Sequence, residues 1–394
     1  MSYQTLNAHT ATLALWYIVN TSLSSYYKLM GAFSDPKSAL SQPVDAWRSL
    51  SIHVAHIKRW EDVDDVMAFV NKVSDDVNRG VYGVLFCDDE AYPIQLTNIY
   101  DPPPVLFYRG NVARLMDKKI AIVGSRNPTE HAQKITFDMA QYLVQSGFSI
   151  TSGLAQGVDR AAHLGALSQD DTLGCTIGVM GTGIDVCYPK NHNALFAQII
   201  QDGGVLITEL LPSTPASKHT FPRRNRLVAG LSLATVVTEA ALQSGSLITA
   251  RLAAEQGKQV FAVPSLIDNK NAEGCHHLIR EGATLIYHPD QILEDIQGES
   301  AYTALPKTFS RGVSAFSDEQ ASSEELKLST KAEPFVPVVP NHLALLISRL
   351  GSEPKDLDAL VASTGMDTGS LLAQLMELEL LGLVAQAGGR YVRT

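Results

Sequence analysis

The chain has 394 residues, 45% of them hydrophobic, and its 41 acidic and 31 basic residues give a formal net charge of −10. This length predicts two to three domains, and the acidic balance argues against indiscriminate binding of polyanions, although a local basic patch can still bind one. The four cysteines form no CxxC pair, which argues against a zinc site or a disulfide framework. The sequence shows neither a cleavable leader nor an apolar run of about 18 residues, so we expect a cytoplasmic protein without a membrane span.

Residues 1–112 predict an N-terminal helical domain that ends in a rigid connector. Apolar residues recur every three or four positions across 46–73, which is the spacing of amphipathic helices. Three consecutive prolines at 102–104 forbid a helix and impose an extended path. A short strand is expected directly after them, at 105–110.

Residues 113–298 alternate between short β-branched runs and amphipathic segments. The expected strands are at 119–124, 148–153, 175–181, 204–209, 233–240 and 258–264. The expected helices between them are at 130–147, 159–168, 191–203 and 246–257. Near-continuous apolar strands that alternate with helices are typical of a parallel sheet covered on both faces. The sequence therefore predicts an α/β domain with a doubly wound, mostly parallel sheet.

The remainder of the chain changes character twice. Residues 299–338 are rich in Ser, Pro, Glu and Lys without periodicity, which predicts a flexible linker. Residues 339–394 predict three helices and then a hairpin, the order of a winged-helix module. Its expected recognition helix, 367–382, contains no basic residue, which argues against duplex binding by this module alone.

Three glycine-rich loops follow predicted strands, at the edge where open parallel sheets bind their ligands. Exposed backbone N–H groups, helix dipoles and an arginine all attract phosphate. None of the loops is a standard nucleotide fingerprint, and glycines that only make tight turns remain an alternative. The candidate anion-binding residues in these loops are Gly124, Ser125, Arg126, Ser152, Gly153, Gly157, Gly181 and Gly183.

A basic stretch, 218–232, contains no carboxylate. Pro222 suits the first position of a helix, which places Arg223 and Arg224 in its first turn. Cations are unfavourable there because the helix N-terminus is already partly positive, so a bound anion is expected to offset them. Phe221 suggests stacking on single-stranded nucleic acid, where each base contributes about 1–3 kcal/mol. The alternatives are solvated surface arginines and a phenylalanine that only packs on its helix.

Taken together, these segments resemble the DNA-processing protein A family, also called DprA or Smf. The core is similar to the family's extended Rossmann domain, and the N-terminal helices are similar to its small helical, SAM-like domain. The sequence departs from the family's pattern at Ser265 and at 275–277. The segments that carry the resemblance are 101–111, 123–129, 152–167, 181–192, 208–210, 221–232, 237–264 and 273–286.

The resemblance implies a protein that binds and protects single-stranded DNA taken up in natural transformation. It also implies loading of the RecA recombinase on that DNA, displacement of single-strand-binding protein, and homodimerisation through the Rossmann domain. The DNA-binding residues that it implies are Arg126, Ser152, Gly153, Lys218, Phe221, Arg223, Arg224 and Asn225.

An enzymatic alternative comes from a related Rossmann group, the lysine-decarboxylase-like phosphoribohydrolases, which hydrolyse nucleoside monophosphates with a PGGxGT loop and a nearby glutamate. The comparable segment, 241–247, lacks the double glycine, and Glu239 is a lone glutamate before it. Asp159 and His163 lie four apart on a helix, but a satisfied structural histidine is the simpler interpretation. With no nucleophile–base pair and no metal cluster in the sequence, we expect a non-catalytic protein without cofactor or metal.

Overall fold

The computed structural model describes residues 3–170 and 173–303, with side chains up to 296, and part of the region from 343 to 393. The chain forms two compact units, Met1–Phe309 and Ser310–Thr394, which are described separately. In the described part of the chain, no helix combines the length and the apolar character that crossing a membrane requires.

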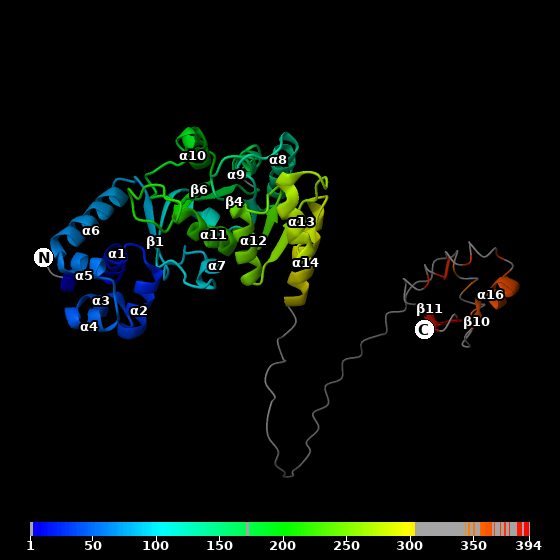
Figure 1. Ribbon diagram of the computed structural model, residues 1–394, viewed down its shortest axis with the longest axis horizontal. Helices are drawn as coiled ribbons and strands as arrows, with labels where there is room; N and C mark the ends of the chain where they lie inside the picture. Colours follow the sequence, from blue (N-terminus) through cyan, green and yellow to red (C-terminus); the bar gives the residue numbers. More distant parts are fainter. Residues whose placement is uncertain are drawn as a thin grey trace, which may run out of the picture. The chain divides into compact units, whose positions relative to one another are not determined.

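The first unit begins with a cluster of helices (Figure 1). Trp16, Trp47 and Leu29 are fully buried between them, and Trp47 stacks on Trp60 with ring centroids 5.4 Å apart. The helices predicted across 46–73 are confirmed as α4 to α6. The elements are η1 (Tyr3–Thr5), α1 (Ala8–Ile18), α2 (Leu23–Phe33), α3 (Pro36–Leu40), α4 (Val44–Ser49), α5 (Val54–Glu61) and α6 (Val63–Asn78).

A nine-stranded sheet follows, in the order β1-β2-β6-β5-β4-β3-β7-β8-β9. The seven strands β6-β5-β4-β3-β7-β8-β9 pair in parallel with their neighbours. At one edge, β2 pairs antiparallel with β6, and β1 pairs antiparallel with β2. The strands are β1 (Gly83–Phe86), β2 (Val105–Gly110), β3 (Lys119–Val123), β4 (Ser149–Ser152), β5 (Thr176–Val179), β6 (Val205–Thr208), β7 (Ala234–Val237), β8 (Gln259–Ala262) and β9 (Thr284–Leu285). The predicted mostly parallel α/β fold is therefore confirmed.

The antiparallel edge joins the sheet to the region before it. The strand predicted at 105–110 is β2, and β1 is a four-residue strand that the sequence pattern did not reveal. Both strands precede residue 112, so the sheet includes part of the region assigned to the N-terminal domain. Phe107 of β2 and Leu206 of β6 share an apolar core with the N-terminal helices.

Helices cover both faces of the sheet, because successive side chains of a buried strand point to opposite faces. Ile120 and Ile122 of β3 pack with α8 and α9, while Ala121 and Val123 pack with α11 and α12. The helices of this region are α7 (Ile94–Thr97), η2 (Val112–Met116), α8 (Glu130–Gln145), α9 (Val158–Leu167), η3 (Lys190–His192), α10 (Asn193–Gln201), α11 (Thr220–Leu231), α12 (Gly245–Glu255), η4 (Lys270–Ala272), α13 (Glu273–Arg280) and α14 (Asp290–Thr303).

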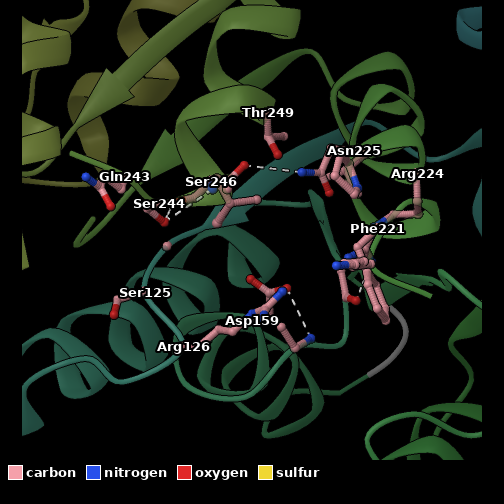
Figure 2. A pocket seen from close by; sticks show the side chains of 18 of the residues that line it. Ser125, Arg126, Asp159, Phe221, Arg224, Asn225, Gln243, Ser244, Ser246 and Thr249 are labelled. Atoms are coloured by element: carbon pink, nitrogen blue, oxygen red, sulfur yellow. Dashed lines mark hydrogen bonds between the residues drawn. The ribbon is translucent and has the colours of Figure 1, made fainter. Parts of the chain in front are cut away.

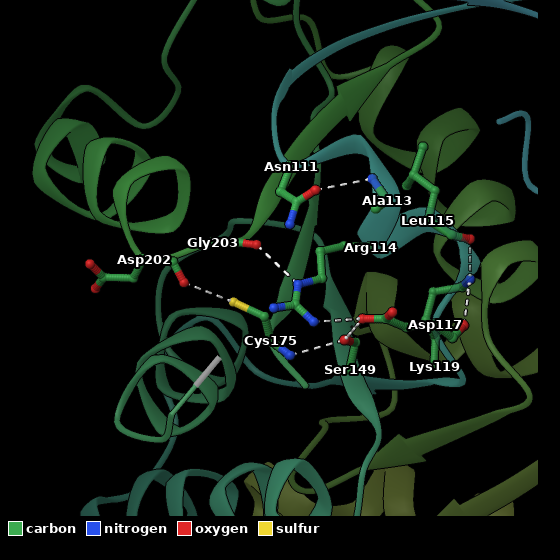
Figure 3. A network of polar contacts seen from close by, with 10 residues as sticks. All are labelled: Asn111, Ala113, Arg114, Leu115, Asp117, Lys119, Ser149, Cys175, Asp202 and Gly203. Atoms are coloured by element: carbon green, nitrogen blue, oxygen red, sulfur yellow. Dashed lines mark hydrogen bonds and ion pairs between the residues drawn. The ribbon is translucent and has the colours of Figure 1, made fainter. Parts of the chain in front are cut away.

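A polar network ties the amino ends of the central strands together (Figure 3). Arg114 forms an ion pair with Asp117 at 3.5 Å and donates from Nε to the carbonyl oxygen of Gly203 at 3.1 Å. Asp117 accepts from the Ser149 hydroxyl at 2.5 Å. Lys119, only 1% exposed, donates to the carbonyl oxygens of Leu115 and Asp117 at 2.6 and 2.9 Å.

The second unit contains a helix and a small sheet. Its elements are β10 (Lys355–Asp356), α16 (Leu357–Thr364), β11 (Val384–Ala387) and β12 (Arg390–Arg393), with strand order β10-β12-β11. The predicted C-terminal hairpin is confirmed by the antiparallel pairing of β11 with β12. The predicted helices at 342–351 and 367–382 lie largely outside the described residues. Of the predicted linker, 299–303 continue α14, and 304–338 lie outside the described residues.

Candidate functional site

The carboxyl ends of the parallel strands surround a cavity of about 680 Å³ (Figure 2). Its walls come from the loops after β3, β4, β6 and β7, from the loop between β5 and η3, and from the N-terminal parts of α9, α11 and α12. The lining residues are Val123, Gly124, Ser125, Arg126, Gly153, Ala155, Asp159, Tyr188, Ala216, Ser217, Lys218, Phe221, Pro222, Arg224, Asn225, Val228, Ala241, Gln243, Ser244, Gly245, Ser246 and Thr249.

The loop after β3 presents an arginine to this cavity. A Cβ on Gly124 would lie 2.7 Å from the backbone oxygen of Glu239, so only glycine fits there. The backbone N–H of Ser125 donates to that same oxygen at 2.6 Å, which holds the loop against the end of β7. Arg126 is exposed, and among the described residues no carboxylate or hydrogen-bond acceptor partners it. Its charge is therefore available to a ligand.

Glu239 stabilises this loop through hydrogen bonds and does not line the cavity. Its side chain is 2% exposed. It accepts from the backbone N–H and the hydroxyl of Thr129 at 2.9 and 2.8 Å, and from the side-chain amide of Asn269 at 3.3 Å. Both carboxylate oxygens are thus engaged at the N-terminus of α8, which is a structural arrangement.

Helix α11 begins at Thr220, with His219 as its N-cap, two residues earlier than the sequence predicted. Pro222 is therefore the third helical residue and not the first, and Arg223 lies beyond it. A proline fits there because the first N–H groups of a helix have no acceptor within the helix. The prediction that Pro222 is the first helical residue is wrong, and Arg223 and Arg224 are the fourth and fifth residues of the helix instead of the second and third.

Arg224 points into the protein from α11. It is 7% exposed and donates to the backbone oxygens of Gly153 and Val179. Burial lowers its pKa to about 10, opposed by the nearby Asp159 carboxylate. Burial likewise raises the pKa of Asp159, opposed by Arg224. A Cβ on Gly153 would lie 2.5 Å from the guanidinium, so that glycine makes room for Arg224 in the cavity wall.

Arg223 and Arg226 are held by a carboxylate from the neighbouring strand. Glu209, at the end of β6, lies 2.9 Å from Arg223 Nε and also pairs with Arg226. Arg223 further donates to the Thr21 hydroxyl at 3.2 Å, and the indole N–H of Trp16 donates to the Glu209 backbone oxygen at 2.9 Å. The basic stretch thus has its carboxylate, and the expectation that a bound anion must offset Arg223 is wrong. These contacts fasten α11 to the N-terminal helices.

Phe221 both packs on its surroundings and lines the cavity. Its ring lies 5.3 Å from the ring of Tyr188, centroid to centroid, at an interplanar angle of 36°. A Cβ on Gly181 would lie 2.6 Å from the Phe221 ring, so Gly181 provides the space that the ring fills. Tyr188 is 48% exposed, and the two rings together form an aromatic wall. The sequence analysis did not identify Tyr188.

The structure brings together eight of the predicted site residues and places five others behind them. Ser152 is fully buried, and its hydroxyl donates to the Ile122 backbone oxygen at 2.7 Å. Gly183 lies against the backbone of the loop at 211–214. The predicted residues that line the cavity are Gly124, Ser125, Arg126, Gly153, Lys218, Phe221, Arg224 and Asn225, and those that do not are Ser152, Gly157, Gly181, Gly183 and Arg223.

The first turn of α12 forms one wall of the cavity. The sequence analysis considered this segment only in relation to the hydrolase alternative and did not predict it as part of the binding site. Ser244 caps this helix, its hydroxyl accepting from the Ser246 N–H at 3.3 Å. The side-chain amide of Asn225 donates to the Gly245 backbone oxygen at 3.2 Å and so links α11 to α12. The Ser-Gly-Ser run in the loop between β7 and the start of α12 was the signal for this wall. The additional polar side chains that it brings to the cavity are Gln243, Ser244, Ser246 and Thr249.

His163, His276 and His277 each contact a nearby residue. His163 is fully buried, its Nδ1 lies 2.7 Å from the Thr176 hydroxyl, and burial lowers its pKa to about 3. This agrees with a structural histidine, but its buried Nε2 has no hydrogen-bond partner among the described residues, so the ring is not fully satisfied. His276 Nε2 lies 3.0 Å from the Ser265 backbone oxygen, so the two departures from the family pattern contact each other. His277 lies 3.1 Å from Glu281.

One group of three potential metal ligands occurs among the described residues. It consists of His9, Asp88 and Asp89, whose ligand atoms lie within 4.8 Å of one another. His9 Nε2 lies 3.3 and 3.6 Å from oxygens of the two carboxylates, and its ring stacks on Phe86. None of the three lines the cavity, so this group lies outside the candidate site.

Two family models match the chain. The model described as DNA recombination-mediator protein A matches residues 83–297, and the model described as DprA winged helix domain matches residues 334–390. The first match begins at β1, in agreement with the inclusion of β1 and β2 in the sheet. The second covers the unit with the C-terminal hairpin.

Characterised proteins give the same result. The chain is 37% identical over 307 residues to Protein Smf of Escherichia coli, covering 78% of this chain and 76% of the relative. It is 44% identical over 209 residues to DNA processing protein DprA of Streptococcus pneumoniae, covering 53% and 72%. The X-ray structure of DprA from S. pneumoniae matches with a TM-score of 0.63 and 33% identity, covering 72% of this chain and 97% of that one.

Proposed function

The chain belongs to the DNA recombination-mediator protein A family, the DprA/Smf proteins, and we propose that it binds single-stranded DNA in the cavity at the carboxyl edge of its sheet. In this proposal the protein protects incoming DNA in natural transformation and loads the RecA recombinase on it, without catalysing a reaction. The proposal rests on the residues that surround the cavity and on the family's DNA-processing role.

The observation that carries the proposal is the pairing of free cations with an aromatic wall. Arg126 and Lys218 are exposed and have no ion-pair partner in the described parts of the chain, and both line the cavity. Phe221 and Tyr188 line the same cavity. Cations that follow a phosphate backbone, together with rings on which bases stack, are the usual means of binding single strands without sequence preference. A duplex, whose bases are already stacked, offers such rings nothing to bind.

The polar wall from α12 supports the same ligand. The N-terminus of a helix favours anions because its N–H groups and dipole point outward. α12 begins at the cavity with Ser244 and Ser246, whose hydroxyls lie 2.6 Å apart. Hydroxyl and amide side chains can donate to phosphate and base edges alike, whereas an unpaired carboxylate would repel the strand. The carboxylate that does line the cavity, Asp159, accepts from the Ala155 backbone N–H at 3.1 Å and lies against Arg224.

The absence of catalysis is part of the proposal. Hydrolysis of a nucleoside monophosphate would need a glutamate that faces the substrate, but Glu239 is buried and occupied by Thr129 and Asn269. Asp159 is buried against Arg224. We therefore expect the purified protein to release neither free base nor ribose phosphate from nucleotides, and detection of either product by chromatography would favour the hydrolase alternative.

The partners are proposed on the family relationship. We propose RecA and single-strand-binding protein as partners and a homodimer formed through the Rossmann domain. A dimer would present two cavities to one strand and so raise the avidity for long DNA.

Competition between single- and double-stranded oligonucleotides across a salt series tests the central part of the proposal. We expect preferential binding of the single strand and an affinity that falls linearly with salt on logarithmic axes. A RecA-loading assay on DNA coated with single-strand-binding protein then tests the finer part. Equal binding of both DNA forms would contradict the aromatic wall, and binding without any stimulation of RecA would contradict only the loading role.

A further inference from the structure

A second hollow adjoins the cavity on the far side of Arg126. It has a volume of about 620 Å³. A smaller cavity of about 160 Å³, lined by Arg126, Gln156, Tyr188 and Phe221 among others, lies between the two. Arg126 lines all three, so the hollows form one track that passes this arginine. The residues that line the second hollow are Arg126, Asn127, Pro128, Gln133, Gln156, Gly157, Arg160, Asn191 and His192.

Arg160 gives the second hollow its own positive charge. It is the third residue of α9, it is exposed, and within the described ranges it has no ion-pair or hydrogen-bond partner. A cation in the first turn is unfavourable because the helix N-terminus is already partly positive. The adjacent Asp159 is buried and directed toward Arg224 and the Ala155 N–H. We argued from the sequence that a cation near a helix N-terminus needs an anion to offset it. This argument failed for Arg223 of α11 because Glu209 neutralises it, but it applies to Arg160 of α9, which no carboxylate neutralises among the described residues.

The two arginines are mounted on segments that the fold fixes against each other. The N–H of Val158, the first residue of α9, donates to the Ser125 backbone oxygen at 3.0 Å. Gly157 has a φ of 77°, and a Cβ there would collide with backbone oxygens of both Ser125 and Arg126. The glycine thus permits direct contact between the Arg126 loop and the start of α9. The segments that carry Arg126 and Arg160 are consequently in direct contact, which fixes the positions of the two residues' backbones relative to each other.

The walls of the second hollow differ from those of the first. Four amide side chains line it, from Asn127, Gln133, Gln156 and Asn191, and no carboxylate does. No phenylalanine, tyrosine or tryptophan lines it either, and His192 is buried with its Nδ1 3.1 Å from the Leu154 backbone oxygen. Such walls suit phosphate and the polar edges of bases or sugars, but they offer no surface for stacking.

We propose that this second hollow is a phosphate-binding subsite for the same single strand as it continues beyond Arg126. The inference rests on the proposed function, because the strand must first occupy the aromatic cavity. The strand then runs from Lys218 and the Phe221–Tyr188 wall, past Arg126, to Arg160. In the first cavity the bases of the strand stack on the aromatic rings. In the second hollow the protein binds the phosphates of the strand through arginine and contacts the strand through amide side chains.

The test compares oligothymidylates of two lengths, one of about 3 nucleotides that fills only the first cavity and one of about 12 that reaches the second. Arg160→Ala should weaken binding of the longer oligonucleotide about tenfold, the effect of losing one charged hydrogen bond, and leave the shorter unchanged. It should also reduce the slope of log affinity against log salt by about 1 for the longer strand. Lys218→Ala should weaken both lengths. Arg48→Ala, an exposed arginine of α4 outside the track, is the matched control.

Oligonucleotides with single uncharged methylphosphonate linkages locate the contact. A methylphosphonate linkage at one position of the longer strand should weaken binding to the wild type. The same linkage should have no effect on binding to Arg160→Ala, because the variant has already lost that phosphate contact. Equal losses for Arg160→Ala at both lengths, or no loss at either, would overturn the second subsite. If Lys218→Ala also had no effect at either length, the proposed function itself would fail, so the two failures are distinguishable.

Discussion

The two ends of the same sheet use positive charge in opposite ways. At the amino ends of the strands, Arg114 and Lys119 are tied to Asp117 and to backbone oxygens (Figure 3). At the carboxyl ends, Arg126 lines a cavity (Figure 2), as does Lys218, and neither has a protein partner among the described residues. The same strands form both ends, so the fold alone does not explain the difference. The presence or absence of a protein partner separates the cations that stabilise the structure from those that are free to bind a ligand.

The carboxyl edge also contains cations of the first kind. Arg223, Arg224 and Arg226 lie on one helix beside the cavity, yet Glu209 and Asp159 neutralise them. Proximity to a candidate site is therefore a poor guide to a ligand-binding role. The presence or absence of a carboxylate partner is the better one, and it can be tested by substitution.

The largest effect is expected for Glu209→Ala. The substitution leaves Arg223 and Arg226 without their carboxylate, and breaking a buried ion pair from one side costs about 3–5 kcal/mol in the free energy of unfolding. Denaturant titration of the variant measures this loss. Glu255→Ala, which removes an exposed glutamate of α12, is the control and should change the stability by less than about 0.5 kcal/mol. A loss equal to that of the control would mean that the arginines do not depend on Glu209.

The next effect is a pH dependence that arises at the amino edge. Burial lowers the pKa of Lys119 and of Lys258 to about 8, below the ordinary value of 10.5. Between those two values each lysine holds fewer protons in the folded chain than in the unfolded chain, so each makes the free energy of unfolding rise with pH, by about 1 kcal/mol per unit.

Buried cysteines and tyrosines act in the opposite direction, because burial raises the pKa of Cys275 and of Tyr27 to about 12. The contribution of Lys119 is therefore measured as the difference between the wild type and Lys119→Met in denaturant midpoints from pH 8 to 10. With rising pH, the free energy of unfolding should rise less, or fall more, in the variant than in the wild type. If the slope were the same in the variant and the wild type, Lys119 would not be the group that titrates.

A smaller effect on stability is expected for Arg114→Ala. The variant loses the ion pair to Asp117 and the hydrogen bond to Gly203, which together should cost about 2 kcal/mol. Its affinity for single-stranded oligonucleotides should not change, because the network lies at the opposite end of the strands from the cavity. A loss of affinity in a variant of unchanged stability would erase the distinction between the two edges.

An effect of similar size, on binding instead of stability, is expected for Phe221→Ala. Loss of one stacked base should weaken oligonucleotide binding by about 1–3 kcal/mol. The slope of log affinity against log salt should stay the same, because stacking releases no counterions. Unchanged affinity would show that Phe221 serves only to pack on Gly181 and Tyr188.

The sequence predicted the sheet and the location of the site because both follow from local pattern. β-branched runs identified β2 to β8, and the rule that parallel sheets bind ligands at their carboxyl ends brought Gly124, Ser125 and Gly153 to one place. The family resemblance added Lys218 and Asn225. These residues all line the cavity.

The roles of individual charges could not be predicted, because ion pairs are tertiary contacts. Glu209 precedes Arg223 by 14 residues, and no local pattern shows that the chain returns to bring them together. Arg160 was overlooked because the neighbouring Asp159 makes the first turn of α9 neutral in sequence, whereas in the fold Asp159 faces inward. Tyr188 lies in a loop, and its contact with Phe221 joins residues that are far apart in the sequence.

The most direct test of the account is the salt dependence of single-stranded oligonucleotide binding by Arg126→Ala. Arg126 lines every hollow of the track and has no partner in the described structure, so its charge is predicted to bind phosphate and nothing else. The variant should keep its stability within about 0.5 kcal/mol, bind more weakly, and show a slope of log affinity against log salt that is reduced by about 1. Superimposable salt lines for the variant and the wild type would contradict the central claim that the free cations of the carboxyl edge hold the DNA backbone.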